Sequence, residues 1–178
     1  MNNNRLYRQG FTLAELLAVV IIVALMVALS VGYYKKSVEQ SRFSEGLTAA
    51  ANIAESINRA YFDDKIAGVS DSSAKKPRKI DLLDVGMTNL KACSSVSDYC
   101  KRTKYFEIQT NTVTNGSVIK AYRGTSTDYK YAIEVTTSYG SPKDRVACVG
   151  TSSGSFDAAS FCESMGYTSK SGNYYTKP

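Results

Sequence analysis

The sequence predicts an α+β fold, in which a long N-terminal α-helix packs on an antiparallel β-sheet of about four strands. Two patterns support this prediction. Apolar residues dominate residues 11–34 and then recur mostly every three or four positions to about residue 62, with no Pro among them, as in one continuous helix. From Lys104 onward the period drops to two and turn residues separate the segments, as in strands.

The first part of this helix is long enough to cross a membrane. The run from Leu16 to Tyr34 contains no Asp, Glu, Lys or Arg. At about 1.5 Å per residue it nearly spans a bilayer core of about 30 Å, and residues 11–15 supply the rest. The predicted spanning helix therefore includes Glu15, and a charge close to hydrocarbon is costly enough to indicate a functional residue with a partner.

The second part of the helix is amphipathic and should pack on its own globular domain. Its apolar stripe consists of Val38, Phe43, Leu47, Ala50, Ala54, Ile57 and Tyr61. We predict a single helix from about Phe11 to about Phe62. Gly32 and Gly46 are its weak points, because a glycine costs about 1 kcal/mol relative to Ala inside a helix.

The segment 63–79 is polar, contains Gly68 and Pro77 and has no regular period, which predicts a surface loop. Its basic cluster has no interleaved aromatic residues and follows several acids, which argues against nucleic-acid binding. The cluster consists of Lys75, Lys76, Arg78 and Lys79. A short turn or helical piece is expected over 80–90.

The predicted sheet contains one clear hairpin. The segments KYFEIQTNTV and SVIKAY flank Asn115-Gly116, a dipeptide that supplies the positive backbone angles of a tight turn. DYKYAIEVTTS and DRVACVG add two further strands, separated by residues 140–142.

All four cysteines follow the apolar run, namely Cys93, Cys100, Cys148 and Cys162. An even number in this part of the chain predicts two disulfides and an oxidising compartment. Four cysteines allow three pairings; nearest-neighbour pairing is favoured because each bond closes a short loop beside a strand. A four-thiolate metal site would need closer paired spacing, so we expect no metal or other cofactor.

Composition argues against an enzyme. The chain has no His, which removes the commonest general base and zinc ligand. It shows no nucleophile with a recognisable base and no phosphate-binding glycine loop. The net charge of +6 comes from 22 basic and 16 acidic residues scattered along the chain and says little about partners.

Three interpretations of the N-terminus compete. Arg5, Arg8, the apolar run and the triplet 28–30, Ala-Leu-Ser, have the layout of a secretory signal peptide, but Glu15 fits it poorly. A plain uncleaved anchor leaves Glu15 without a partner. The third interpretation is cleavage between Gly10 and Phe11, before the apolar run.

The stretch GFTLAELL, residues 10–17, follows a short basic leader and precedes the apolar run. It resembles the class III signal of the type IV pilin family, which includes the pseudopilins of type II secretion. The likeness is close from Arg5 to about Phe62 and extends only in outline beyond, where the family's helix-plus-sheet fold agrees with the pattern. It implies that a prepilin peptidase cuts after Gly10 and N-methylates Phe11.

The resemblance further implies a leader at 1–10, a transmembrane and assembly half of the helix at 11–34, and a pilin globular domain at 35–178. It assigns Glu15 to pairing with the Phe11 amine of a neighbouring subunit during fibre assembly, where two opposite charges neutralise each other. Gly32 lies where many type IV pilins carry a helix-bending Pro, so a bend or melting there stays open.

The implied function is a structural subunit of a type IV pilus; the alternative is a pseudopilin of a type II secretion system. The tail SKSGNYYTKP contains no acid, whereas the major pseudopilins are generally shorter, lack disulfides and carry an acidic calcium-binding loop. Implied partners are other pilin subunits, the prepilin peptidase, an inner-membrane assembly platform and, before assembly, membrane lipid.

Basic residues in the leader place it in the cytoplasm under the positive-inside rule, although Lys35 and Lys36 weaken the asymmetry. The disulfides place the C-terminal domain in an oxidising periplasm or exterior. The resemblance implies the periplasm before assembly and the extracellular pilus afterwards.

We predict that the mature protein begins at Phe11, because the Gly10–Phe11 bond lies directly between the basic leader and the apolar helix. Intact-mass spectrometry of the membrane-bound or surface-exposed protein measures this. A terminus at Val31 would instead show a secreted soluble protein, and an intact Met1 would show a plain anchor.

Overall fold

The computed structural model describes residues 11–74, 79–80, 83, 90–93, 99–113, 115–139, 145–150 and 156–178. The chain divides into two compact units, Met1–Gln40 and Ser41–Pro178. Lys75, Lys76 and Arg78 of the predicted basic cluster, most of the expected turn at 80–90 and Gly10 lie outside the described residues.

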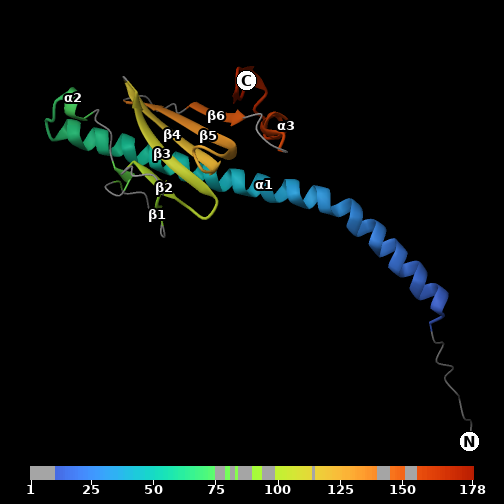
Figure 1. Cartoon of the computed structure of the whole chain (residues 1–178). Helices are drawn as coiled ribbons and strands as arrows, with labels where there is room; N and C mark the ends of the chain where they lie inside the picture. Colours follow the sequence, from blue (N-terminus) through green and yellow to red (C-terminus); the bar gives the residue numbers. More distant parts are fainter. Residues whose placement is uncertain are drawn as a thin grey trace, which may run out of the picture. The chain divides into compact units, whose positions relative to one another are not determined.

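The long helix α1 spans Leu13–Ile66 and contributes residues to both units (Figure 1). It runs four residues past the predicted end at Phe62, so the expected loop at 63–79 is wrong at its beginning. The helix ends where Gly68 adopts a positive φ of 76°. The Gly68 N–H donates to the Lys65 carbonyl at 3.1 Å and the Val69 N–H to the Asp64 carbonyl at 2.9 Å, the bonding pattern of a Schellman motif.

A second part of the predicted loop is also helical. The short helix α2 spans Asp71–Ala74, and the ammonium group of Lys65 pairs with the Asp71 carboxylate. This contact links the last turn of α1 to the first residue of α2, and a propensity argument on polar residues could not anticipate it.

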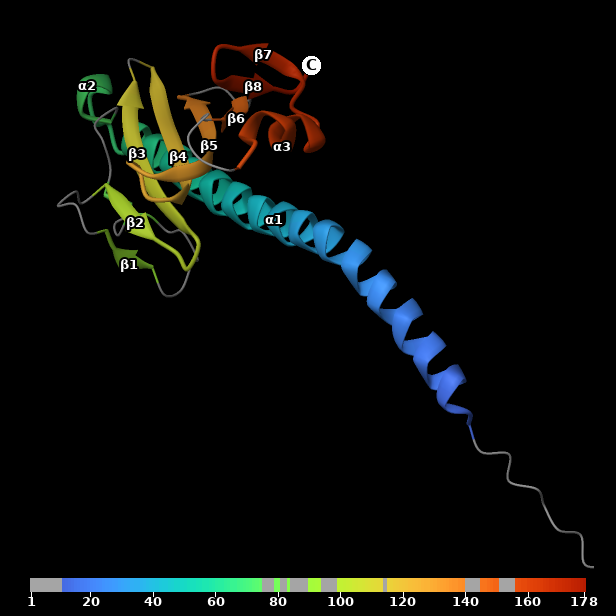
Figure 2. The same cartoon turned by 45° about the vertical axis from the view of Figure 1, so that its right-hand side comes forward.

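The α+β class is confirmed, but the sheet is larger than predicted. Within the described residues it is antiparallel and has eight strands in the order β1-β2-β3-β4-β5-β6-β8-β7, which are labelled in Figure 2. The four predicted strands form its centre: β3 (Phe106–Val113), β4 (Gly116–Gly124), β5 (Tyr129–Ser138) and β6 (Arg145–Gly150). The additional strands are β1 (Lys91–Ala92), β2 (Cys100–Arg102), β7 (Ser169–Ser171) and β8 (Tyr174–Thr176). Each has only two or three residues, too few to show a period of two.

The core of the second unit lies between the sheet and residues 43–57 of α1. Buried side chains come from alternate positions of the strands and from one stripe of the helix. The strands supply Phe106, Ile108, Ile119, Ile133 and Val135, and the helix supplies Phe43, Ala50, Ile53, Ala54 and Ile57. The predicted stripe, which began at Val38, is thus the packed face from Phe43 to Tyr61, whereas Val38 is half-buried and outside this core. Farther along, Asn58 Nδ2 donates to Thr137 Oγ1 at 2.6 Å and the rings of Tyr61 and Tyr139 stack at 4.6 Å.

At Gly46 the backbone of α1 lies very close to side chains of the sheet. A Cβ atom at this position would lie 2.7 Å from Cζ of Phe106 and 3.0 Å from Cδ1 of Ile133. The glycine is therefore a packing requirement, whereas the sequence indicated only a weak point. At Gly32 a Cβ would meet nothing within 4 Å.

The predicted hairpin is present, but its glycine has another role. Val113 of β3 pairs with Gly116 of β4, so Gly116 is a strand residue, and it is not among the glycines with positive φ. A Cβ at Gly116 would lie 1.9 Å from the carbonyl oxygen of Thr137 in β5. The residue is small because two strands meet closely there.

The C-terminal segment closes one end of the core. Helix α3 spans Ala158–Ser164, and the Asp157 carboxylate caps it by accepting from the Ser160 N–H at 3.0 Å. Phe161 of this helix stacks on Tyr131 of β5 with ring centroids 4.7 Å apart. Figure 2 shows α3 and the β7–β8 hairpin grouped together beyond β6.

We expect Gly46→Ala to lower the free energy of unfolding of the globular unit. Overpacking a core costs about 1–3 kcal/mol, which outweighs the gain of about 1 kcal/mol in helix propensity. Denaturant unfolding measures the change, with Gly32→Ala as the matched control that adds the same methyl group in open space. A stabilised Gly46→Ala variant would contradict the assigned contact.

Candidate functional site

The N-terminus of α1 is closed by its own side chains. Both the backbone N–H and the hydroxyl of Thr12 donate to Oε2 of Glu15 at 2.8 Å. The Glu15 N–H in turn donates to Oγ1 of Thr12 at 3.3 Å. This reciprocal arrangement is a capping box, which satisfies donors that the first helical turn leaves without intrahelical acceptors.

The capping box explains how one carboxylate is accommodated at the start of an apolar helix. Glu15 lies in the first turn of α1, where the helix dipole favours a negative charge. In the full-length chain Phe11 is joined to Gly10 and has no free amine, and the carboxylate bonds to Thr12 instead. Our sequence analysis missed Thr12, although Thr-x-x-Glu ahead of an apolar run is a recognisable signal for this motif.

The helix beyond Glu15 presents apolar side chains to its surroundings as far as Tyr34. Exposed large apolar residues include Leu16, Leu17, Val20, Ile22, Leu25, Met26 and Leu29. One window of α1 is long and apolar enough to cross a membrane, and no part of that window is buried. The hydroxyl of Ser30 is satisfied within the helix, donating to the Met26 carbonyl at 2.7 Å. An apolar surface this extensive indicates a membrane or protein contact.

The structure places the predicted site residues in separate regions. Phe11 lies just before α1 and is 79% exposed, and Glu15 follows one turn later. The cysteines all lie in the second unit, where they form two disulfides, Cys93–Cys100 and Cys148–Cys162. These are the two nearest-neighbour pairs, and no free cysteine is found in the described part of the chain.

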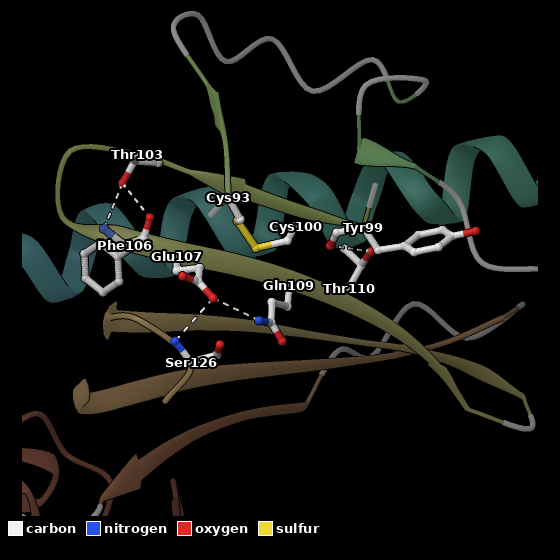
Figure 3. Close-up of a disulfide and its surroundings, with 9 residues drawn as sticks. All are labelled: Cys93, Tyr99, Cys100, Thr103, Phe106, Glu107, Gln109, Thr110 and Ser126. Atoms are coloured by element: carbon white, nitrogen blue, oxygen red, sulfur yellow. Dashed lines mark hydrogen bonds between the residues drawn. A yellow bond between two sulfur atoms is a disulfide. The ribbon is translucent and has the colours of Figure 1, made fainter. Parts of the chain in front are cut away.

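The two disulfides differ in what they join. Cys148 of β6 and Cys162 of α3 are separated by 14 positions, have no exposed surface, and tie α3 to the sheet. Cys93 and Cys100 are separated by 7 positions and join the end of β1 to the start of β2 (Figure 3). The Cys93–Cys100 disulfide therefore holds an edge of the sheet. The Cys148–Cys162 disulfide holds α3, a helix that packs on the core.

A buried acid lies beside the Cys93–Cys100 disulfide. The Glu107 side chain and the two sulfur atoms lie within 4.8 Å of one another. Both sulfur atoms are consumed in the disulfide, so no thiolate is left to bind a metal. The Glu107 carboxylate accepts from Gln109 Nε2 at 2.9 Å and from the Ser126 N–H at 3.2 Å (Figure 3). These bonds give the acid a structural role between β3 and the β4–β5 turn.

Comparison with protein families recognises the N-terminal part of the chain. Residues 5–31 match the family model described as the prokaryotic N-terminal methylation motif. This motif is the class III signal of type IV pilins and pseudopilins. No curated protein and no solved structure matches the chain. The recognised segment contains Phe11, Thr12, Glu15 and most of the exposed apolar helix.

We expect loss of the Cys148–Cys162 disulfide to destabilise the globular unit more than loss of Cys93–Cys100. For the loop of about 15 residues between Cys148 and Cys162, chain entropy suggests that the disulfide stabilises the fold by about 3 kcal/mol. This disulfide also holds α3 against the core. Thermal unfolding of the double Cys→Ala variants compares the two. A larger loss from the Cys93/Cys100 variant would show that the sheet edge, and not α3, limits stability.

Proposed function

We propose that the chain is a structural subunit of a type IV pilus, which polymerises through its N-terminal helix into a surface filament. The observation that carries the proposal is a lone carboxylate, Glu15, at the start of an exposed apolar helix and inside the N-terminal methylation motif. A prepilin peptidase removes residues 1–10 and methylates Phe11. Residues 11–34 then act as the membrane and assembly segment, and residues 35–178 as the globular domain.

The capping box supports a change of partner for the Glu15 carboxylate between the membrane and the filament. Before assembly, the Thr12 donors and the helix dipole stabilise the carboxylate at the edge of the membrane. Processing creates a cationic amine on Phe11. In the filament this amine pairs with the Glu15 of a neighbouring subunit, because an ion pair with good geometry is tolerated where either single charge is not.

This pairing lets Glu15 fix the axial register of neighbouring subunits. The surrounding helix surface is apolar apart from Ser30, so apolar contacts alone would allow many axial positions of similar energy. A subunit that docks out of step leaves one carboxylate and one amine unpaired, and this penalty selects a single register.

The features of the globular unit favour a pilus over a type II secretion pseudopilus. It carries two disulfides, which suit a filament exposed to an oxidising exterior. The tail after α3 contains Ser, Lys, Tyr and Thr but no acid, so it lacks the acidic calcium-binding loop by which we distinguish the major pseudopilins. Before assembly the leader faces the cytoplasm and the globular domain the periplasm, with the assembly platform and membrane lipid as partners.

We expect a strain lacking this gene to lose surface filaments by electron microscopy, and the wild-type gene to restore them. Glu15→Gln and Glu15→Ala should restore few or none, although both proteins are processed, inserted and folded, because Gln keeps the hydrogen bonds of the cap but not the charge. Thr12→Ala is the matched control: it removes the cap, keeps the charge, and should restore filaments.

Filaments of normal abundance from Glu15→Gln would defeat the charge-pairing proposal. Failure of Thr12→Ala alone would instead assign the function of the motif to capping. Loss of protein export with filaments intact would favour the pseudopilin.

A further inference from the structure

A buried carboxylate lies against the Cys93–Cys100 disulfide near one edge of the sheet. A carboxylate oxygen of Glu107 and the two Sγ atoms all lie within 4.8 Å of one another. Cys100 and Glu107 are 2% and 4% exposed, whereas Cys93 is only half-buried. An acid therefore lies beside a disulfide whose two sulfur atoms differ in how easily a reagent reaches them.

Strand pairing fixes Cys100 next to Glu107. Cys100 of β2 pairs with Gln109 of β3, and Glu107 lies two positions along β3 from Gln109, so the three side chains belong to the same face of the sheet. Pairing continues before Cys100, where the Thr110 N–H donates to the Tyr99 carbonyl at 2.9 Å (Figure 3). A thiolate formed on Cys100 would therefore lie next to the carboxylate.

The hydrogen bonds of Glu107 suit an ionised carboxylate. Its Oε1 accepts from Gln109 Nε2 at 2.9 Å and from the Ser126 N–H at 3.2 Å (Figure 3). Both donors are N–H groups, and an ionised carboxylate acts only as an acceptor. Arg102 is the strand partner of Glu107, but the contacts of these two described residues include no ion pair between them. The negative charge beside the disulfide is thus held by neutral donors.

Reduction of a disulfide by thiols moves negative charge across its sulfur atoms. A thiolate forms a bond to one Sγ, the Cys93–Cys100 bond breaks, and the electron pair leaves on the other Sγ. A second thiolate then displaces the first as a disulfide, so two thiols are oxidised and both cysteines are reduced. Attack falls on the more accessible Cys93, and the leaving thiolate forms on Cys100. Beside the like charge of Glu107 this thiolate is a poorer leaving group.

We propose that Glu107 protects the Cys93–Cys100 disulfide kinetically against reduction by thiols. Its charge repels the incoming thiolate and opposes release of Cys100. The residues of the other disulfide, Cys148 and Cys162, have no exposed surface, so burial alone shields that bond. With Glu107 in place, β1 stays joined to β2 when the globular unit meets a thiol. Neither the membrane anchor nor filament assembly is required for this protection.

The test follows both disulfides separately in the full-length chain, held in a neutral detergent. Cysteines 93 and 100 share the tryptic peptide 92–101, and cysteines 148 and 162 share the peptide 146–170. Samples taken during reduction are alkylated, digested and measured by mass spectrometry. The reductants are neutral dithiothreitol, cationic cysteamine and anionic 2-mercaptoethanesulfonate, each in large excess. The ionic strength is about 10 mM, where the Debye length is about 30 Å.

We expect Glu107→Gln to speed the reduction of Cys93–Cys100 by dithiothreitol about tenfold, toward the lower end of what Coulomb's law gives for two charges about 5 Å apart. Gln keeps the oxygen that accepts from Gln109 and Ser126. The acceleration, measured against wild type within each reagent, should be about threefold larger for the anionic thiol than for the cationic one. This difference should vanish near 1 M salt, where the Debye length falls to about 3 Å. Reduction of Cys148–Cys162 should be unchanged.

The matched control is Glu134→Gln. Glu134 is another largely buried acid of the sheet, with its side chain 15% exposed, and it loses the same charge. The register runs from Cys100 through Gln109 and Lys120 to Glu134, which is three strand spacings or about 14 Å. The control should therefore reduce at Cys93–Cys100 within about twofold of wild type.

Each result bears on the protection. Equal acceleration with the anionic and the cationic thiol would show that Glu107→Gln only loosens the sheet edge, and would overturn the proposal. An unchanged rate would do the same, and so would an equal acceleration in Glu134→Gln. A mixed disulfide located on Cys100 instead of Cys93 would overturn the direction of attack. If Glu107→Gln also exposes Cys148–Cys162, Glu107→Asp, which draws the charge back by one carbon, should give a smaller acceleration with the same dependence on thiol charge.

Discussion

The close approach of α1 to the sheet at Gly46 is the contact on which the globular unit depends. Phe106 and Ile133 lie so near the helix backbone that a single methyl group would collide with them. On either side of this point the helix stripe and the inner faces of β3–β6 interdigitate. The helix stripe, the central strands β3–β6 and α3, which packs through Phe161, all belong to this single core cluster.

The two units differ in whether their apolar side chains are buried. The globular unit buries its apolar residues within its own chain and holds its edge and its α3 helix by disulfides. The apolar side chains of the first unit remain exposed up to Tyr34, and burying them requires lipid or other protein chains. Under the proposed function, this contrast lets the helix exchange a bilayer for a filament while the folded domain stays unchanged.

Charge at the start of α1 is stabilised locally. Glu15 accepts hydrogen bonds from the Thr12 donors within one helical turn, so the motif carries its own compensation within the chain. Under the proposed function, the amine of a neighbouring subunit takes over this role in the filament. The folded domain is not needed for either state of the carboxylate, because Thr12 and Glu15 both lie at the end of the exposed apolar helix.

The sequence alone determined the features that depend on neighbouring residues. Helical periodicity located α1, alternation located β3–β6, and Gly10, Phe11 and Glu15 identified the processing motif that the family model matches at 5–31. The capping box was also readable, since Thr12 and Glu15 are three positions apart. Only the tertiary structure decided the roles of Gly46 and Gly116, the four short outer strands and the gathering of Arg42 and Arg123 around Tyr105. The two glycine roles and the gathering around Tyr105 rest on contacts between residues far apart in the chain, and a local pattern carries no information about such contacts. The short strands contain too few residues to show a period of two.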